Sequence, residues 1–145
     1  MLGQALKDSG FDGKVYTVDL SAENLTVGCR NIAAAGLSQF VEAAQSDSVP
    51  FLTHPPYRAP IAFAFLDSNH LCEHVKAEFA AIHPWLDNRS VVFFDNTAPH
   101  SNGTRRVHEA LQEIQNQYGG NLINFPNTSW DPPGQAVWQR NGLPA

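Results

Sequence analysis

Two apolar runs that each end in an aspartate constrain the fold most strongly. Residues 61–66 are almost wholly apolar and lead into Asp67, and residues 90–94 repeat this form and lead into Asp95. A run that is apolar at nearly every position indicates a strand buried on both faces, which occurs chiefly in parallel sheets covered by helices. Ligands of such sheets bind just beyond the carboxyl ends of the strands. If the two runs are neighbouring parallel strands, Asp67 and Asp95 emerge side by side at one edge of the sheet.

Strand-like and helix-like patterns alternate along the rest of the chain. Ser21 can cap a helix whose apolar stripe includes Leu25, Cys29 and Ile32, at the spacing of an amphipathic helix. The full set of predicted helices covers 2–9, 21–36, 71–83 and 107–118, and the further predicted strands cover 14–19, 40–47, 121–125 and 135–140. The proline-rich stretch 48–60 is predicted to be a loop with one helical turn. This order predicts an α/β fold with a mostly parallel, doubly wound sheet, closed by a hairpin that adds an antiparallel edge, in a single domain over 1–145.

Composition excludes several classes of protein. Hydrophobic residues make up 43% of the chain and charged residues 16%, which is typical of a globular domain. The net charge of −5 comes without a basic block, which argues against nucleic-acid binding. Cys29 and Cys72 are too few for a disulfide scaffold, and no long apolar segment indicates a signal peptide or a membrane span. We therefore expect a cytoplasmic protein with reduced thiols and no membrane partner.

Acidic side chains at the predicted strand ends are the candidate site residues. Asp67, Asp95 and Asn96 offer hard oxygen ligands at one edge, which suits Mg²⁺ or another divalent cation, and such an ion could hold both oxygens of a diol or catechol. Asp19 follows the first strand, where doubly wound folds place an acid that binds ribose hydroxyls, and Asp47 could lie near an adenine. The alternative is that Asp and Asn are simply common where strands run into turns.

The order of these motifs resembles the class I S-adenosylmethionine-dependent methyltransferases. Residues 13–19, with Ala35-Gly36-Leu37 and Asp47, are similar to their second and third strands and the helix between. Residues 65–70 and 94–97 resemble the cation-dependent O-methyltransferases of the catechol and caffeoyl-CoA type, and the Asp-x-x-His form resembles a related group that methylates sugars of natural products. The resemblance implies a Rossmann-like three-layer sandwich. It also implies the following roles: a cation at Asp67, Asp95 and Asn96, with S-adenosylmethionine against Asp19 and Asp47.

One part of the family pattern is not found in this sequence. The family's first strand and glycine-rich turn should precede Gly13, yet no Gly-x-Gly lies upstream of that residue. We therefore expect a methyltransferase-like domain that lacks its first strand and glycine-rich loop, as in an N-terminally truncated chain. The two flanking strands would then pair directly, or their exposed edges would be covered by another chain, so that a homo-oligomer could form through strand edges.

The leading interpretation is cation-assisted methyl transfer from S-adenosylmethionine to a hydroxyl of a small-molecule acceptor. Asp67 and His70 are the candidate catalytic residues. For His70 the reason is that a neutral imidazole can bind the acceptor or take its hydroxyl proton near pH 7. The activity requires a cofactor site that is intact or completed by another chain.

Two other interpretations stay open at the level of sequence. The first is a non-catalytic remnant or oligomeric binding module that has lost cofactor binding. The second is a zinc hydrolase, because His70, Glu73 and His74 match the H-x-x-E-H pattern of one peptidase group. Trp130 and Trp138, with Tyr57, could line an aromatic acceptor pocket, although aromatic residues in closing strands more often pack in the core.

Overall fold

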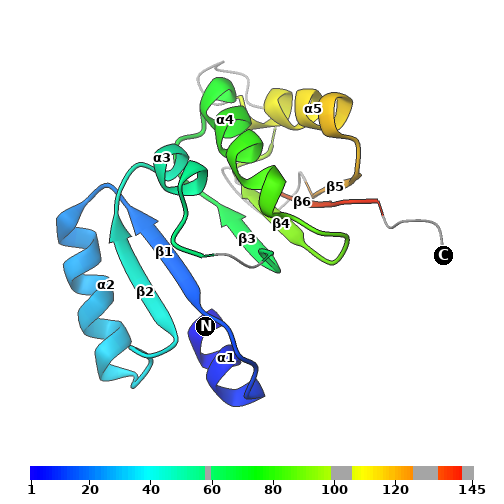
Figure 1. Cartoon of the computed structure of the whole chain (residues 1–145). Helices are drawn as coiled ribbons and strands as arrows, with labels where there is room; N and C mark the ends of the chain where they lie inside the picture. Colours follow the sequence, from blue (N-terminus) through cyan, green and yellow to red (C-terminus); the bar gives the residue numbers. More distant parts are fainter. Residues whose placement is uncertain (58–59, 99–105, 126–133, 142–145) are drawn as a thin grey trace. The chain divides into compact units, whose positions relative to one another are not determined.

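The computed structural model describes residues 1–57, 60–98, 106–125 and 134–141. The chain divides into two compact units, Met1–Phe51 and Leu52–Ala145, and each is described here by itself. Figure 1 gives the course of the chain through both units. The single-domain organisation stays a prediction.

The first unit contains a two-stranded parallel sheet and its helices. Its elements are α1 (Leu2–Ser9), β1 (Val15–Asp19), α2 (Ala22–Ala34) and β2 (Val41–Gln45). The predicted cap is confirmed, because the Ser21 side chain accepts a hydrogen bond of 3.2 Å from the backbone N–H of Asn24. The stripe of α2 is only partly covered: Leu25 and Ile32 are half-buried and Cys29 is exposed. The helical turn in the proline-rich stretch is the short helix α3 (Ser48–Thr53).

The second unit contains a mixed four-stranded sheet. Its elements are β3 (Phe63–Leu66), α4 (Cys72–Ile82), the 3₁₀ turn η1 (His83–Trp85), β4 (Val91–Asp95), α5 (Val107–Tyr118), β5 (Asn121–Phe125) and β6 (Gln135–Gln139). The strand order is β3-β4-β6-β5, with β3 parallel to β4 and β6 antiparallel to both of its neighbours. The predicted α/β fold with an antiparallel C-terminal strand is confirmed.

The position of the antiparallel strand differs from the expectation. The sequence predicted a hairpin that adds an antiparallel edge, but β6 lies between β4 and β5, and the edge strand β5 runs parallel to β4. The physical reason is burial, since Ala136 and Trp138 of β6 are both fully buried. An edge position would leave one side of this strand open to water.

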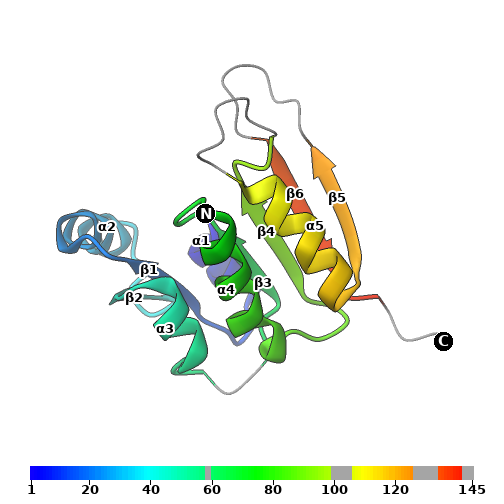
Figure 2. The same cartoon turned by 90° about the horizontal axis from the view of Figure 1, so that it is seen from above.

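The core of the second unit lies between this sheet and two helices. Helices α4 and α5 pack on the same face of the sheet, as Figure 2 shows. Phe79 of α4 meets Trp138 of β6 edge to face, with ring centroids 4.9 Å apart, and Phe94 of β4 lies beside it. A pair of this kind contributes roughly 0.5–1.5 kcal/mol beyond the burial of its area.

The other face of the same sheet carries exposed apolar side chains. Phe63 and Phe65 of β3 are 41% and 48% exposed, and Ile123 and Phe125 of β5 are 57% and 50% exposed. Val92 and Phe94 of β4 are buried on the covered face. The expectation that the apolar runs are buried on both faces is therefore met on one face only, because α4 and α5 both cover that one.

The two sheets share no strand in the described part of the chain. Strand β1 pairs with β2 in the first unit, and β3 pairs with β4 in the second. Direct pairing of the two strands that flank the missing one stays a prediction, as does the covering of their edges by another chain. None of the described helices has both the length and the apolar character that crossing a membrane requires.

Candidate active site

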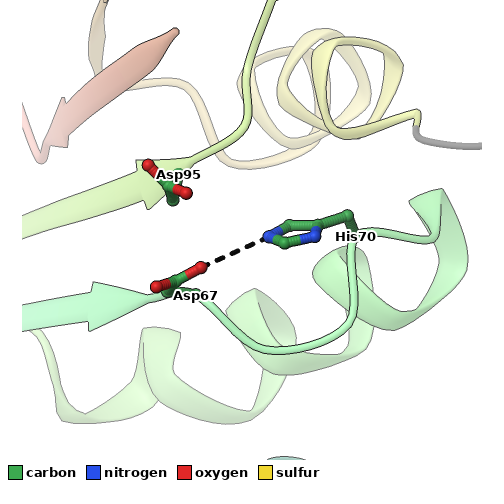
Figure 3. A group of neighbouring side chains, drawn as sticks. All are labelled: Asp67, His70 and Asp95. Carbon is green, nitrogen blue, oxygen red and sulfur yellow. Dashed lines mark ion pairs between the residues drawn. The ribbon is translucent and has the colours of Figure 1, made fainter. Parts of the chain in front are cut away.

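The parallel pairing of β3 and β4 brings two carboxylates to one edge. Leu66 is the register partner of Phe94, so Asp67 and Asp95 follow at the same height. The loop from β3 to α4 carries His70 back toward them, as Figure 3 shows. One ligand atom from each of these three side chains lies within 4.8 Å of the others. The structure therefore brings together the two acids as the sequence predicted, with His70 beside them.

His70 is held in place from two directions. Its Nε2 lies 3.4 Å from Oδ1 of Asp67, and its backbone carbonyl accepts a hydrogen bond of 3.1 Å from the N–H of Arg106, directly before α5. The side chain of His70 is 17% exposed, whereas that of Asp67 is 47% exposed. The imidazole thus forms the inner wall of the group, and Asp67 forms the side open to solvent.

Asn96 completes the group from the end of β4. Its Nδ2 donates a hydrogen bond of 2.7 Å to Oδ2 of Asp95 and lies 2.9 Å from Nε2 of His70. If Nε2 accepts from this amide, the imidazole proton is on Nδ1. The backbone of Asn96 has φ 55°, in the left-handed region that residues other than glycine rarely adopt. This conformation turns the amide back onto Asp95.

The two carboxylates influence each other electrostatically. The pKa of Asp67 is raised, first because partial burial desolvates the carboxylate and second because the negative charge of Asp95 is close. The His70 imidazole opposes this shift through its hydrogen bond and its charge. A cation between the carboxylates would remove the repulsion.

The donor set fits a divalent cation. Ligand atoms on one such ion lie roughly 2.0–2.6 Å from it, and hence up to roughly 4–5 Å from each other, which matches the 4.8 Å limit of this group. Carboxylate oxygens suit Mg²⁺, Ca²⁺ and Mn²⁺. For Asn96 to be a ligand, its amide must turn so that Oδ1, rather than Nδ2, faces Asp95. Two oxygens repel at that distance, so a cation between them would favour this turned form.

Asp19 and Asp47 lie at the ends of the two parallel strands of the first unit. Asp19 accepts hydrogen bonds from the N–H of Ser21 at 2.7 Å and from the side-chain amide of Asn24 at 3.1 Å, and these bonds lower the pKa of its carboxyl. Asp47 accepts one of 2.9 Å from the N–H of Val49 at the start of α3. Both acids therefore hold the turns that lead into α2 and α3, and their contact with a cofactor stays a prediction.

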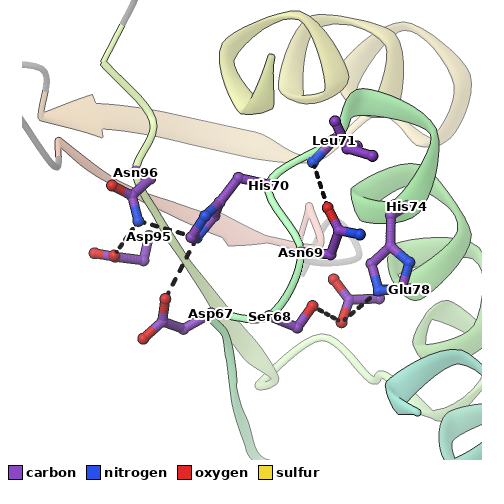
Figure 4. A network of polar contacts seen from close by, with 9 residues as sticks. All are labelled: Asp67, Ser68, Asn69, His70, Leu71, His74, Glu78, Asp95 and Asn96. Carbon is purple, nitrogen blue, oxygen red and sulfur yellow. Dashed lines mark hydrogen bonds and ion pairs between the residues drawn. The ribbon is translucent and has the colours of Figure 1, made fainter. Parts of the chain in front are cut away.

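The side chains of the zinc-hydrolase pattern, His70, Glu73 and His74, do not converge on one point in the structure. His70 directs Nε2 toward Asp67, whereas His74 directs Nε2 toward Oε1 of Glu78 at 3.7 Å, and Figure 4 shows the two imidazoles at different carboxylates. Glu73 forms an ion pair of 3.0 Å with Lys76 on the surface of α4. The H-x-x-E-H match thus places its two histidines in separate surroundings.

The aromatic residues considered for an acceptor pocket are placed elsewhere. Trp138 is fully buried in the core, and Tyr57 packs edge to face against Trp85 with ring centroids 5.5 Å apart. Trp130 lies outside the described residues. Because it is buried in the core, Trp138 does not line an acceptor pocket as the sequence suggested.

One contact near the site was not predicted. The Ser68 hydroxyl donates a hydrogen bond of 2.5 Å to Oε1 of Glu78, whose side chain is 1% exposed. The signal was present in the sequence, because Glu78 falls three residues after Val75 and four before Ile82, on the apolar stripe of α4. A carboxylate in such a stripe is seldom fully buried without a partner.

Comparison with known proteins places the chain in a family. The family model described as Methyltransferase domain matches residues 1–97. A search of curated proteins gives no match. Among solved structures, cofactor-bound Rv0187 from MTB superposes with a TM-score of 0.77 at 16% identity, over 97% of this chain and 68% of that one.

Two further structures show the same fold. The O-methyltransferase TomG from Streptomyces achromogenes, involved in tomaymycin synthesis and in complex with SAM, gives a TM-score of 0.68 at 15% identity over 90% of this chain. The O-methyltransferase from Bacillus cereus in complex with SAH gives 0.69 at 15% identity, also over 90%. The chain spans 63% and 64% of these two proteins, less than two thirds of their length. Since the family model covers 97 of the 145 residues and reaches past Asp67, Asp95 and Asn96, the chain belongs to the methyltransferase domain family.

Proposed function

We propose that this chain is an O-methyltransferase that transfers the methyl group of S-adenosylmethionine to a hydroxyl of a small molecule, assisted by a divalent cation. The observation that carries the proposal is the convergence of Asp67, His70 and Asp95 at one sheet edge, in a chain of the methyltransferase domain family. The names of two neighbours of the same fold support it, since both are O-methyltransferases, one in complex with SAM and one with SAH.

The residues of the site would divide the work as follows. Asp67, Asp95 and Asn96 would hold the cation, which when bound lowers the pKa of a coordinated hydroxyl and orients its oxygen. His70 would bind the acceptor and take its hydroxyl proton at Nε2, the atom that faces Asp67. Asp67 would stabilise the imidazolium that results, because its Oδ1 lies 3.4 Å away.

The reaction itself is a displacement at carbon. The acceptor oxygen forms a bond to the methyl carbon while the methyl–sulfur bond breaks, and the sulfur keeps the electron pair. The proton of the hydroxyl leaves through His70 to solvent. Most of the rate would come from alignment of the reactants, because a well-held pair reacts as one molecule.

Asp19 and Asp47 would face the cofactor. Asp19 uses one lone pair on each oxygen for Ser21 and Asn24, so further acceptor capacity remains for ribose hydroxyls. The lowered pKa keeps its carboxylate ionised, which is the form that accepts hydrogen bonds. Asp47, after the neighbouring strand, would lie near the adenine.

Calorimetric titration with S-adenosylmethionine, in the presence and absence of Mg²⁺, tests the proposal. We expect S-adenosylmethionine to bind specifically, in the micromolar range. When Mg²⁺ is the titrant, we expect Asp67→Asn and Asp95→Asn to weaken its binding by at least about tenfold. Glu113→Gln is the charge-matched control, because its carboxylate lies on α5 and pairs with Lys76. Heat silence under both conditions would instead support the non-catalytic remnant.

A further inference from the structure

We infer that Glu78 is a positioning residue which, through Ser68, fixes the short loop carrying both Asp67 and His70. The inference rests on the proposed function, because it assigns Glu78 a role in keeping that site assembled. Glu78 lies in α4, on the far side of this loop from the cation group, as Figure 4 shows.

The burial of Glu78 requires an explanation. Its side chain is 1% exposed, and a buried carboxylate costs several kcal/mol unless hydrogen bonds and charges compensate it. Oε1 accepts the 2.5 Å hydrogen bond from Ser68 and lies 3.7 Å from Nε2 of His74, while Oε2 has no hydrogen-bond partner within the described ranges. A side chain that served packing alone would be apolar here, as Val75 and Phe79 are on the same stripe.

Ser68 lies between the two functional side chains. It directly follows Asp67 and comes two residues before His70, so its position sets the path of the loop between them. Asn69 tightens the same loop, because its Oδ1 accepts a hydrogen bond of 3.1 Å from the N–H of Leu71. The loop is therefore held on the α4 side by Ser68 and Glu78.

The loop is held on its other side by the backbone before α5. The N–H of Arg106 donates to the carbonyl of His70 at 3.1 Å. The Ser68–Glu78 bond and this contact lie on either side of the turn, and together they would fix the separation of Asp67 and His70. Groups that hold metal ligands in place typically contribute about 10- to 100-fold to metal affinity.

Mn²⁺ affinity, measured by electron paramagnetic resonance on the full chain, tests the inference. We expect Ser68→Ala and Glu78→Leu each to weaken Mn²⁺ binding about tenfold or more, since both remove the same hydrogen bond. The double variant should lose no more than either single variant, because the two side chains act as one unit. Glu78→Gln keeps an acceptor oxygen for Ser68 and should restore most of the affinity.

Ser90→Ala is the matched control. Ser90 is also fully buried and hydrogen-bonded, to Asp87, but it lies before β4 at the other end of that strand. An equal loss in Ser90→Ala would overturn the inference, because general destabilisation would then explain the effect. Unchanged affinity in Ser68→Ala, or additive losses in the double variant, would overturn it as well.

Hydrogen exchange of the amides of residues 68–71 separates this inference from the proposed function. If the wild-type chain binds no Mn²⁺, the proposed cation site fails, and exchange alone then decides the role of Glu78. Faster exchange in Ser68→Ala and Glu78→Leu, but not in Ser90→Ala, would support a loop fixed by Glu78. Unchanged exchange in both variants would overturn it.

Discussion

Asn96 is the residue where backbone conformation and site geometry depend most directly on each other. Its left-handed φ of 55° directs the amide onto Asp95 and His70. A non-glycine residue in this region costs of order 1 kcal/mol or more, although asparagine tolerates it better than most. The backbone of Asn96 therefore places the amide in the site at a cost in the stability of the fold.

Two substitutions at Asn96 separate these effects. We expect Asn96→Gly to be at least about 1 kcal/mol more stable than Asn96→Ala, because glycine adopts positive φ without a steric penalty. Both variants lose the amide, so both should bind Mg²⁺ more weakly than the wild-type chain. Chemical denaturation and calorimetry measure the two effects, and equal stabilities for the two variants would contradict the strain argument.

At the residue scale, the sequence was sufficient to predict that Asp67 and Asp95 lie close together. Asp67 and Asp95 follow two apolar runs, and the rule that parallel strands end at one edge places them together. The contact of Ser68 with Glu78 could not be derived in this way, because it depends on the rotation of α4 and on the path of a loop. Those are set by packing, and Glu78 alone carried a visible signal.

At the scale of elements, helices and strands were predicted to within a few residues. Apolar periodicity identifies which side of an element is buried. It does not fix the order of strands in a sheet, and so the position of β6 between β4 and β5 was missed. It also did not show that Phe63 and Phe65 face away from the covered side, because a run that is apolar at every position has the same pattern on both faces.

The junction of α4 and η1 makes stability depend on pH through His83. Burial, and after it the charge of Arg140, lower the pKa of this imidazole below its usual 6.5. The unfolded chain therefore takes up the proton at higher pH than the folded chain does. Stability is full above about pH 6.5 and falls as the pH drops from there toward the lowered pKa of the folded state.

Chemical denaturation at pH 7.5 and pH 5.5 measures this dependence. We expect His83→Gln to lose less stability between these two pH values than the wild-type chain, because its side chain takes up no proton. His54→Gln, at an exposed position, is the control and should keep the wild-type difference. An unaltered difference in His83→Gln would contradict the prediction.

At the scale of the whole molecule, unpaired strand edges and an apolar sheet face remain. Among the described strands of its sheet, β3 has one neighbour, β4, and it carries Phe63 and Phe65 on the face that α4 and α5 leave open. An unpaired edge offers backbone hydrogen-bonding groups to another chain. That the chain forms a homo-oligomer by pairing such strand edges stays a prediction.

Sedimentation over a range from micromolar to hundreds of micromolar tests the oligomer. We expect association to rise with concentration in the wild-type chain and to decrease in Phe63→Lys, since a lysine on an edge strand opposes pairing. Leu20→Lys replaces an apolar side chain of the first unit that is 68% exposed, against 41% for Phe63, and should have no effect. A wild-type chain that stays monomeric throughout would rule the prediction out.

The place of β6 has a consequence for synthesis on the ribosome. Strand β6 follows β5 along the chain and joins it to the remainder of its sheet, since among the described strands β5 pairs with β6 alone. Until translation passes Gln139, a nascent chain can build β3 and β4 but has nothing to which β5 can attach. Assembly of this sheet is therefore delayed until β6 has been made, and a premature stop before β6 would leave β4 without its second neighbour and β5 without its partner, both open to capture by chaperones.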